Sequence, residues 1–315
     1  MRLDRRKFLG PLFKPLSRVK HSRASRILNA TLWLPSQLIR ARQNRPYFVV
    51  NIASRNGMGA LLSEAILMSA YAESRNLIPV ITSSNPLYSI ELGDDCLALY
   101  FEPMNQYELP YNLKPMRFHT LWSFYHLNFP RHIAIEQANR LFKIYFSPKP
   151  IIKERVDLVL RQIQGGQFDL SIHYRGTDKA LEAPLVKYET FADAIRRYQG
   201  MIDGLGSVFL ATDDSKFEEF IQQAFPAIEF ITYKLGEPLD ASRGRHFSDM
   251  RPEDKAIEAI VNMFLIASSK FCIRSSSYLS AISKIINPDL RTQTLNVTHW
   301  GSTEFPEYEV NESER

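Results

Sequence analysis

The chain has 315 residues, 45% of them hydrophobic, so it is long enough for two domains of ordinary size with a substantial core. Its only two cysteines, Cys96 and Cys272, exclude a disulfide framework and a cysteine-rich metal cluster, and we predict both to be reduced core thiols. The seven histidines show no paired-ligand spacing and no apolar run reaches about 18 residues, so we expect neither a metal site nor a transmembrane helix.

The net charge of +5 conceals a basic N-terminal arm, residues 1–46. Through residue 45 the chain carries twelve Lys or Arg and one Asp, a balance of +11 that leaves −6 for the remainder. The arm begins with DRRKFLG, which is similar to a twin-arginine export signal, but Lys14, Arg18 and Lys20 interrupt the apolar stretch that follows. We favour a solvated tail over an arm that lies on an anionic membrane. The arm has no recognition module for nucleic acid, so no nucleic-acid partner is expected.

After the arm, the sequence predicts a strand, a tight turn and a helix. YFVVNI at 47–52 is the strand, Asn56–Gly59 the turn, and 61–74 a helix of mostly apolar and small residues. A second strand is predicted at 77–82. The glycines of the turn allow either the close approach of a substrate to the backbone or a sharp reversal of the chain.

Residues 83–131 are rich in aromatic residues and turn formers and lack a clear period, so we expect loops there. Helical patterns follow at 133–143 and 150–163, and the QGGQ turn after them indicates a boundary. We therefore predict two domains, at 47–165 and 166–315.

The second half of the chain alternates between strand and helix patterns, as a parallel sheet requires. The predicted strands lie at 168–174, 207–212, 228–233 and 270–274, and the predicted helices at 189–202, 215–224, 253–268 and 276–286. Because the carboxyl ends of parallel strands meet at one edge of a sheet, the residues after three of these strands are expected to line one crevice.

The strand at 168–174 belongs to the stretch FDLSIHYRGTDK, in which Arg175, Asp178 and Lys179 cluster. A forked and permanently charged guanidinium suits two phosphate oxygens, although a solvated ion pair is the alternative. Two further strands end in Asp213 and Asp214 and in Ser275–Ser277, and serines there can cap a helix and leave amides for phosphate. There is no GxGxxG and no GxxxxGK[ST] motif, so the pattern favours a nucleotide or nucleotide-sugar site over a dinucleotide oxidoreductase or a P-loop NTPase.

At HYRGTDK the sequence resembles the fucosyltransferase superfamily, whose members share an HxRxxD-type donor motif, and most of all glycosyltransferase family 23. That family includes the core α1,6-fucosyltransferase and the nodulation-factor fucosyltransferases. The resemblance continues through FLATDDSKFEEF and IVNMFLIASSKFCIRSSSYLS and, more loosely, through NGMGALLSEAILMSAYAESRNLIPVI. It implies an α/β fold of GT-B-like type with two Rossmann-type domains and parallel sheets. Residues 47–165 would form the N-terminal Rossmann-like, acceptor-side domain, with acceptor-binding loops at 83–131, and residues 166–315 the C-terminal donor-binding domain. It also implies an inverting transfer that needs no metal or other cofactor and uses GDP-fucose as donor.

The resemblance also implies roles for individual residues. Arg175 would neutralise the departing diphosphate with Lys179 beside it, and Glu182 would be the general base, with Asp178 as its rival. The donor-binding set, taken from the resemblance and the strand ends together, is His173, Arg175, Thr212, Asp213, Asp214, Arg245, Asn262, Ser275, Ser276 and Ser277. The acceptor-side loop would include Asn56, Gly57 and Gly59.

Three positions depart from the family pattern. Gly176 stands where the core enzyme has a second Arg, Asn262 stands where relatives tend to have Asp, and Glu182 falls one residue early. Three alternatives therefore stay open: a transferase of the same fold with another nucleotide sugar, an inactive protein that binds a GDP-sugar or glycan, and an adaptor that acts through the arm. The expected acceptor is a glycan or glycolipid, and the expected location is the cytoplasm, with peripheral membrane contact through residues 1–45 as an alternative.

Overall fold

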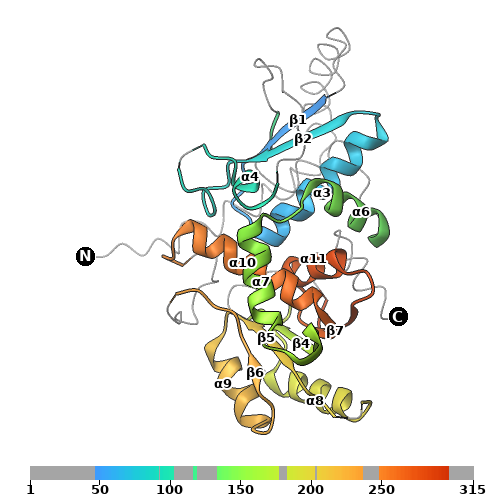
Figure 1. Cartoon of the computed structure of the whole chain (residues 1–315), viewed down its shortest axis with the longest axis vertical. Coiled ribbons are helices and arrows are strands. Elements are labelled where there is room, and N and C mark those ends of the chain that lie inside the picture. Colours follow the sequence, from blue (N-terminus) through green and yellow to red (C-terminus); the bar gives the residue numbers. More distant parts are fainter. Residues whose placement is uncertain are drawn as a thin grey trace, which may run out of the picture.

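A computed structural model gives the fold of the protein. It describes residues 47–91, 93–102, 116–118, 133–176, 183–202, 204–236 and 248–297, with the backbone alone at 116–118. Two parallel sheets lie toward opposite ends of the molecule, and helices lie between them (Figure 1). Within these residues, no helix is long and apolar enough to cross a membrane.

The first sheet contains β1 (Tyr47–Ile52), β2 (Ile78–Ser83) and β3 (Met116–Phe118) in the order β2-β1-β3, with all pairs parallel. Helix α3 (Met58–Ser74) joins β1 to β2, because parallel neighbours require a crossover connection. Nearly every residue of α3 is buried, which fits its run of apolar and small side chains. The helix starts at Met58, three residues before the predicted start.

The second sheet contains five parallel strands in the order β6-β5-β4-β7-β8. Their bounds are β4 (Phe168–Tyr174), β5 (Val208–Thr212), β6 (Phe230–Ile231), β7 (Ser269–Arg274) and β8 (Arg291–Thr294). The chain moves outward from β4 to β6 and then returns to form β7 on the other side of β4. The topological switch point therefore lies between β4 and β7, where ligands of open α/β sheets bind beyond the strand ends.

Helices cover both faces of the second sheet. Helices α8 (Tyr188–Gln199) and α9 (Ser215–Ala224) share one apolar cluster with inward-facing residues of β4 and β5. Helices α10 (Pro252–Ala267) and α11 (Tyr278–Ile286) belong to a second cluster, which includes Phe168 and Cys272. This arrangement of helices on both sides of a parallel sheet is the doubly wound architecture expected from the alternating sequence pattern.

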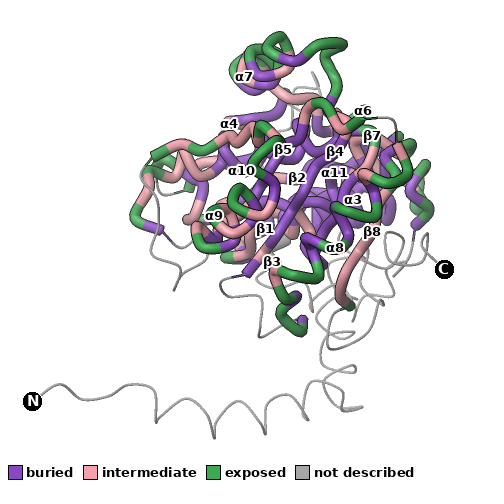
Figure 2. The backbone as a smooth tube through the Cα atoms, turned by 90° about the horizontal axis from the view of Figure 1, so that it is seen from below, coloured by how far each residue is buried: buried purple, intermediate pink, exposed green. Residues whose placement is uncertain are grey.

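The second cluster continues into the first half of the chain. It includes residues of β1, α3, α6 (Ile135–Tyr145) and α7 (Pro150–Leu160), and Figure 2 shows the backbone buried along β1 and α3. The side-chain amide of Asn139 donates hydrogen bonds to the carbonyls of Ile285 (2.7 Å) and Ile286 (3.1 Å) at the end of α11. The glycine turn at Gln164–Gly166 separates the two sheets, but the division into domains at residue 165 stays a prediction because one core spans it.

Several element predictions were incomplete. Helix α4 (Cys96–Tyr100), β3 and β8 were not predicted, and only Phe230–Ile231 of the strand predicted at 228–233 forms a ladder. The polar sequence RTQT of β8 gives no strand signal, because this edge strand is only partly buried. Both cysteines are free and buried, as predicted. Most of the predicted acceptor-loop region, at 103–115 and 119–132, lies outside the described residues.

Candidate active site

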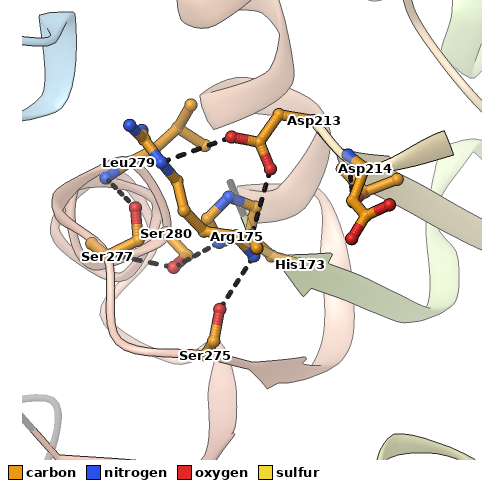
Figure 3. A network of polar contacts seen from close by, with 10 residues as sticks. His173, Arg175, Asp213, Asp214, Ser275, Ser277, Leu279 and Ser280 are labelled. Atoms are coloured by element: carbon orange, nitrogen blue, oxygen red, sulfur yellow. Dashed lines mark hydrogen bonds and ion pairs between the residues drawn. The ribbon is translucent and has the colours of Figure 1, made fainter. Parts of the chain in front are cut away.

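Arg175 follows β4 directly and lies at the switch point. Its backbone N–H donates to the hydroxyl of Ser275 (2.9 Å), and the N–H of Ser275 donates to the carbonyl of His173 (3.0 Å). These bonds join the carboxyl ends of β4 and β7 (Figure 3). The backbone that carries Arg175 is therefore fixed at the edge where a ligand of this fold would lie.

Asp213 holds the side chain of Arg175 from the neighbouring strand end. One carboxylate oxygen lies 3.4 Å from Nε of Arg175, and the other accepts the N–H of Gly176 at 3.1 Å (Figure 3). The side chains of Arg175 and Asp213 are 22% and 9% exposed, so the pair is partly shielded from water. The carboxylate thereby restricts the guanidinium to one side of the cleft, which makes Asp213 a positioning residue for Arg175.

Asp214 has a different role, although it was predicted in the same donor-binding set. Its carboxylate accepts the backbone N–H groups of Lys216 (3.0 Å) and Phe217 (3.3 Å) and caps α9. The hydroxyl of Tyr188 also donates to it at 2.7 Å, and the hydroxyl of Thr212 accepts its N–H at 3.1 Å. These contacts are those of a helix cap, and a donor contact of Asp214 or Thr212 stays a prediction.

The three serines after β7 are buried and have separate partners. Ser275 accepts from Arg175, Ser277 caps α11 by accepting the N–H of Leu279 (3.3 Å), and Ser276 bonds to Asn296 through both its N–H and its hydroxyl. The amides of Ser276 and Leu279 are therefore already paired. A phosphate at this helix start would have to use other amides of the turn or displace these bonds.

Arg274 is a fully buried arginine that sequence analysis missed. Its guanidinium donates to the hydroxyl of Ser280 (2.8 Å), the carbonyl of Ser277 (2.7 Å) and the hydroxyl of Thr294 (3.2 Å). Ser280 in turn lies 2.9 Å from Nδ1 of His173, so the buried imidazole is held by α11 (Figure 3). The available signal was that Arg274 ends a buried strand, as Arg175 almost does in β4. The two arginines nevertheless differ, because one is enclosed and the other lies at the surface of the cleft.

Packing explains the glycine at 176, where the core enzyme has a second Arg. A Cβ atom there would lie 2.5 Å from Cε1 of Tyr174 and 2.9 Å from Oδ2 of Asp214. The ring of Tyr174 is itself buried and stacks on Phe217 at 4.2 Å between centroids. A larger residue at this position would displace the ring or the cap of α9.

The turn between β1 and α3 lies on the other side of this region. The N–H of Met58 donates to the hydroxyl of Tyr88 (2.8 Å), and the positive charge of Arg175 lowers the pKa of that hydroxyl against a larger rise caused by burial. The turn and Arg175 therefore both lie near the hydroxyl of Tyr88. Tyr88 was missed by sequence analysis because it lies in a stretch without periodicity.

Gly59 of this turn packs against the protein's own backbone. A Cβ atom at Gly59 would lie 2.6 Å from the backbone nitrogen of Leu279 and 2.6 Å from the carbonyl carbon of Tyr278. The starts of α3 and α11 therefore touch, which neither of the two predicted uses of the glycine had foreseen. A role of Asn56, Gly57 and Gly59 toward an acceptor stays a prediction.

We expect Gly59→Ala to lower the free energy of unfolding by about 1–3 kcal/mol, because the added methyl group meets backbone atoms that cannot rotate away. This loss exceeds the gain of about 1 kcal/mol that alanine offers inside a helix. Urea unfolding measures the effect. Gly200→Ala is the matched control, since a Cβ there stays 3.5 Å from its nearest neighbour. Equal stability of the two variants would contradict the packing of α3 on α11.

Glu64 of α3 is a buried carboxyl group that sequence analysis also missed. It is 0% exposed, and desolvation raises its pKa to about 8 despite hydrogen bonds from the side chains of Asn56 (2.9 Å) and Ser54 (3.2 Å). The carboxyl group therefore holds a proton at neutral pH. The one available signal was a lone glutamate within the apolar run LLSEAILMSA.

Asn262 lies inside α10, where its side-chain amide donates to the carbonyls of Glu258 (2.8 Å) and Tyr233 (3.2 Å). No contact described here joins it to Arg175, and its donor contact stays a prediction. Four predicted site residues lie outside the described residues: Asp178, Lys179, Glu182 and Arg245. Among the described residues, His, Cys, Asp and Glu form no group of three that could hold a metal ion.

The fold is shared with known fucosyltransferases. The selenomethionine form of fucosyltransferase NodZ from Bradyrhizobium matches with a TM-score of 0.53 at 18% identity, over 76% of this chain and 92% of that chain. NodZ α1,6-fucosyltransferase soaked with GDP-fucose matches with a TM-score of 0.52 at 17% identity, over 76% and 93% of the two chains. A variant of Arabidopsis thaliana FUT1 in complex with GDP has a TM-score of 0.50 at 11% identity, over 80% and 71%.

No protein-family model matches the sequence, and no curated protein matches it significantly. At these identities, the structural likeness establishes the fold. The predicted fold class, α/β of GT-B-like type with parallel sheets, is confirmed, and so is the resemblance to fucosyltransferases at the level of the fold.

Proposed function

We propose that this chain, which has the fold of the GT-B-like fucosyltransferases, is itself an inverting fucosyltransferase. It would move fucose from GDP-fucose to a hydroxyl group of a glycan or glycolipid. The observation that carries the proposal is the place of Arg175, which Asp213 and Ser275 fix at the switch point of the second sheet. NodZ has the same fold and was solved after soaking with GDP-fucose.

The reaction requires a positive charge beside the diphosphate group as it departs. The acceptor oxygen attacks the anomeric carbon while the bond from that carbon to the β-phosphate oxygen breaks, and GDP leaves with the electron pair. A guanidinium that is already oriented stabilises this developing charge without reorganising. Arg175 would supply that charge, so we propose that the reaction does not depend on a divalent metal.

The acceptor hydroxyl must also lose a proton, and a carboxylate within hydrogen-bond reach would take it. Glu182 is the first candidate and Asp178 the second, as the family pattern suggests. Both follow Arg175 within seven residues of the sequence. The assignment of the base stays a prediction.

A panel of donors in the presence of EDTA tests the function. We expect slow release of GDP from GDP-fucose without any acceptor, and little release from GDP-mannose or UDP-glucose. Release from another donor alone would favour a transferase of the same fold with a different nucleotide sugar. Binding of GDP without release under any condition would favour the inactive binding protein, and loss of release on adding EDTA would contradict metal independence.

A further inference from the structure

The buried carboxyl group of Glu64 has no assigned part in the proposed transfer, yet it holds the turn between β1 and α3. Its Oε1 accepts from the side-chain amide of Asn56 and its Oε2 from the hydroxyl of Ser54. These two residues flank the exposed Arg55 in the turn between β1 and α3. One buried group therefore fixes the turn at two points.

The turn is also bonded to two residues that follow β2. The carbonyl of Asn56 accepts from the side-chain amide of Asn85 (2.8 Å), and the N–H of Met58 donates to the hydroxyl of Tyr88. The hydroxyl of Tyr88 also lies close enough to Arg175 for the positive charge to influence it. A shift of Asn56 would therefore disturb Asn85 and Tyr88, beside Arg175.

The surroundings of Glu64 favour its neutral form. Burial raises its pKa to about 8, and the bonds from Asn56 and Ser54 are the only opposing influences. The shift comes from burial, Asn56 and Ser54, and not from the charged and titratable groups on the turn, on α3 and on the elements that contact α3, which are Tyr47, Arg55, Tyr71, Glu73, Glu136, Arg140, Lys143, Tyr145, Glu253, Asp254, Lys255, Glu258, Tyr278 and Lys284. In the neutral acid the proton can lie on Oε2, which then donates to the hydroxyl of Ser54 across the same 3.2 Å contact, while Oε1 still accepts from Asn56.

We propose that Glu64 is a positioning residue whose neutral carboxylic acid holds the Ser54–Gly57 turn in place against Asn85 and Tyr88, in the shape that the proposed transfer needs. Ionisation would place an anion in a dry site with only two donors, and water entering to solvate it would release the turn. The expected effect on activity rests on the proposed function, whereas the order of the turn is measurable without substrate.

The test compares the full-length wild-type protein with Glu64→Gln, Glu64→Ala and the control Glu73→Gln. Glutamine reproduces the neutral acid, since it accepts from Asn56 and donates to Ser54, but it cannot ionise. Glu73 is a second glutamate of α3, paired with Arg140 at the surface, so its variant makes the same replacement of a carboxyl group by an amide away from the turn. Two quantities are followed from pH 6 to pH 9.5: hydrogen-exchange protection of residues 54–58, and kcat and KM for GDP release from GDP-fucose.

In the wild type and Glu73→Gln, we expect protection of the turn and kcat to fall together above pH 8, with kcat about tenfold lower at pH 9 than at pH 7. KM for GDP-fucose should change little, because neither Glu64 nor the turn belongs to the proposed donor-binding set. In Glu64→Gln, protection of the turn and kcat should stay constant through this range. Glu64→Ala should lose protection of the turn at every pH. A Glu64→Gln variant that loses protection above pH 8 as the wild type does would overturn the proposal. If no variant releases GDP, the proposed function fails, and the exchange data still decide the role of Glu64.

Discussion

Replacing Arg175 with alanine is expected to slow GDP release from GDP-fucose by about 10²–10³-fold, the loss that follows removal of one preorganised charge-stabilising donor. That factor corresponds to about 3–4 kcal/mol of transition-state stabilisation. Binding of GDP-fucose should weaken by less, because the charge on the departing diphosphate grows only as the glycosidic bond breaks. Steady-state kinetics that separate kcat from KM measure the difference.

Two further variants make this result specific. Arg175→Lys keeps the charge but loses the forked geometry and the Nε atom that faces Asp213, so its rate should fall between those of the wild type and Arg175→Ala. Arg196→Ala removes an exposed arginine that pairs with Asp193 on α8, and it should release GDP at the wild-type rate. A folded Arg175→Ala protein with wild-type turnover would remove Arg175 from the mechanism.

The second large effect concerns stability and its dependence on pH. Burial raises the pKa of Glu64 from 4.5 to about 8, and a shift of that size corresponds to about 5 kcal/mol at most. Because the folded state keeps a proton that the unfolded state releases, this contribution is complete below pH 4.5. It is lost as the pH rises to about 8, and a folded protein above that pH contains a buried carboxylate.

Glu64→Gln lacks this titration. Its free energy of unfolding relative to the wild type should therefore increase steadily between pH 5 and pH 8, by up to about 5 kcal/mol, and then stay level. Urea unfolding at a series of pH values measures the difference, with Glu73→Gln as the control that should run parallel to the wild type. Parallel curves for Glu64→Gln and the wild type would show that the buried carboxyl group does not titrate in this range.

The architecture of the second half could be predicted from sequence because each strand is a short apolar run, and a segment with helical periodicity follows it. Such runs predicted β4, β5 and β7 to within a residue at either end. The apolar pattern could not predict β8, since RTQT is polar and forms a strand only because it pairs with the edge of β7. Helix α4 is a single turn that Asp95 caps, too short to show a period.

The candidate site was readable only in part. Arg175, Asp213 and Ser275 follow three strands of one parallel sheet, so their meeting at its edge could be deduced from topology. The place of Tyr88 near Arg175 could not, because Tyr88 comes from the first half of the chain, in a stretch after β2 that has no period. Asp214 and Ser277 look like site residues in the sequence, but both cap helices, and sequence gives both uses the same signature.

Gly176, where an arginine is missing, illustrates the same limit of prediction from sequence. Compared with the core enzyme, the sequence shows a missing arginine, which suggests weakened catalysis. The structure shows that Tyr174 and Asp214 fill the space a side chain would need, so the glycine follows from local packing. Measurements on the donor site therefore test whether Arg175 alone stabilises the leaving group.

The most direct measurement is calorimetric titration of the full chain with GDP-fucose, GDP and UDP-glucose in the presence of EDTA. We expect GDP-fucose and GDP to bind with one site per chain, and UDP-glucose to bind far more weakly. We also expect Arg175→Ala to retain GDP-fucose binding within about tenfold, because the growing charge is stabilised chiefly in the transition state. A folded wild-type protein that binds no guanosine nucleotide would contradict the assignment of this fold to GDP-fucose chemistry.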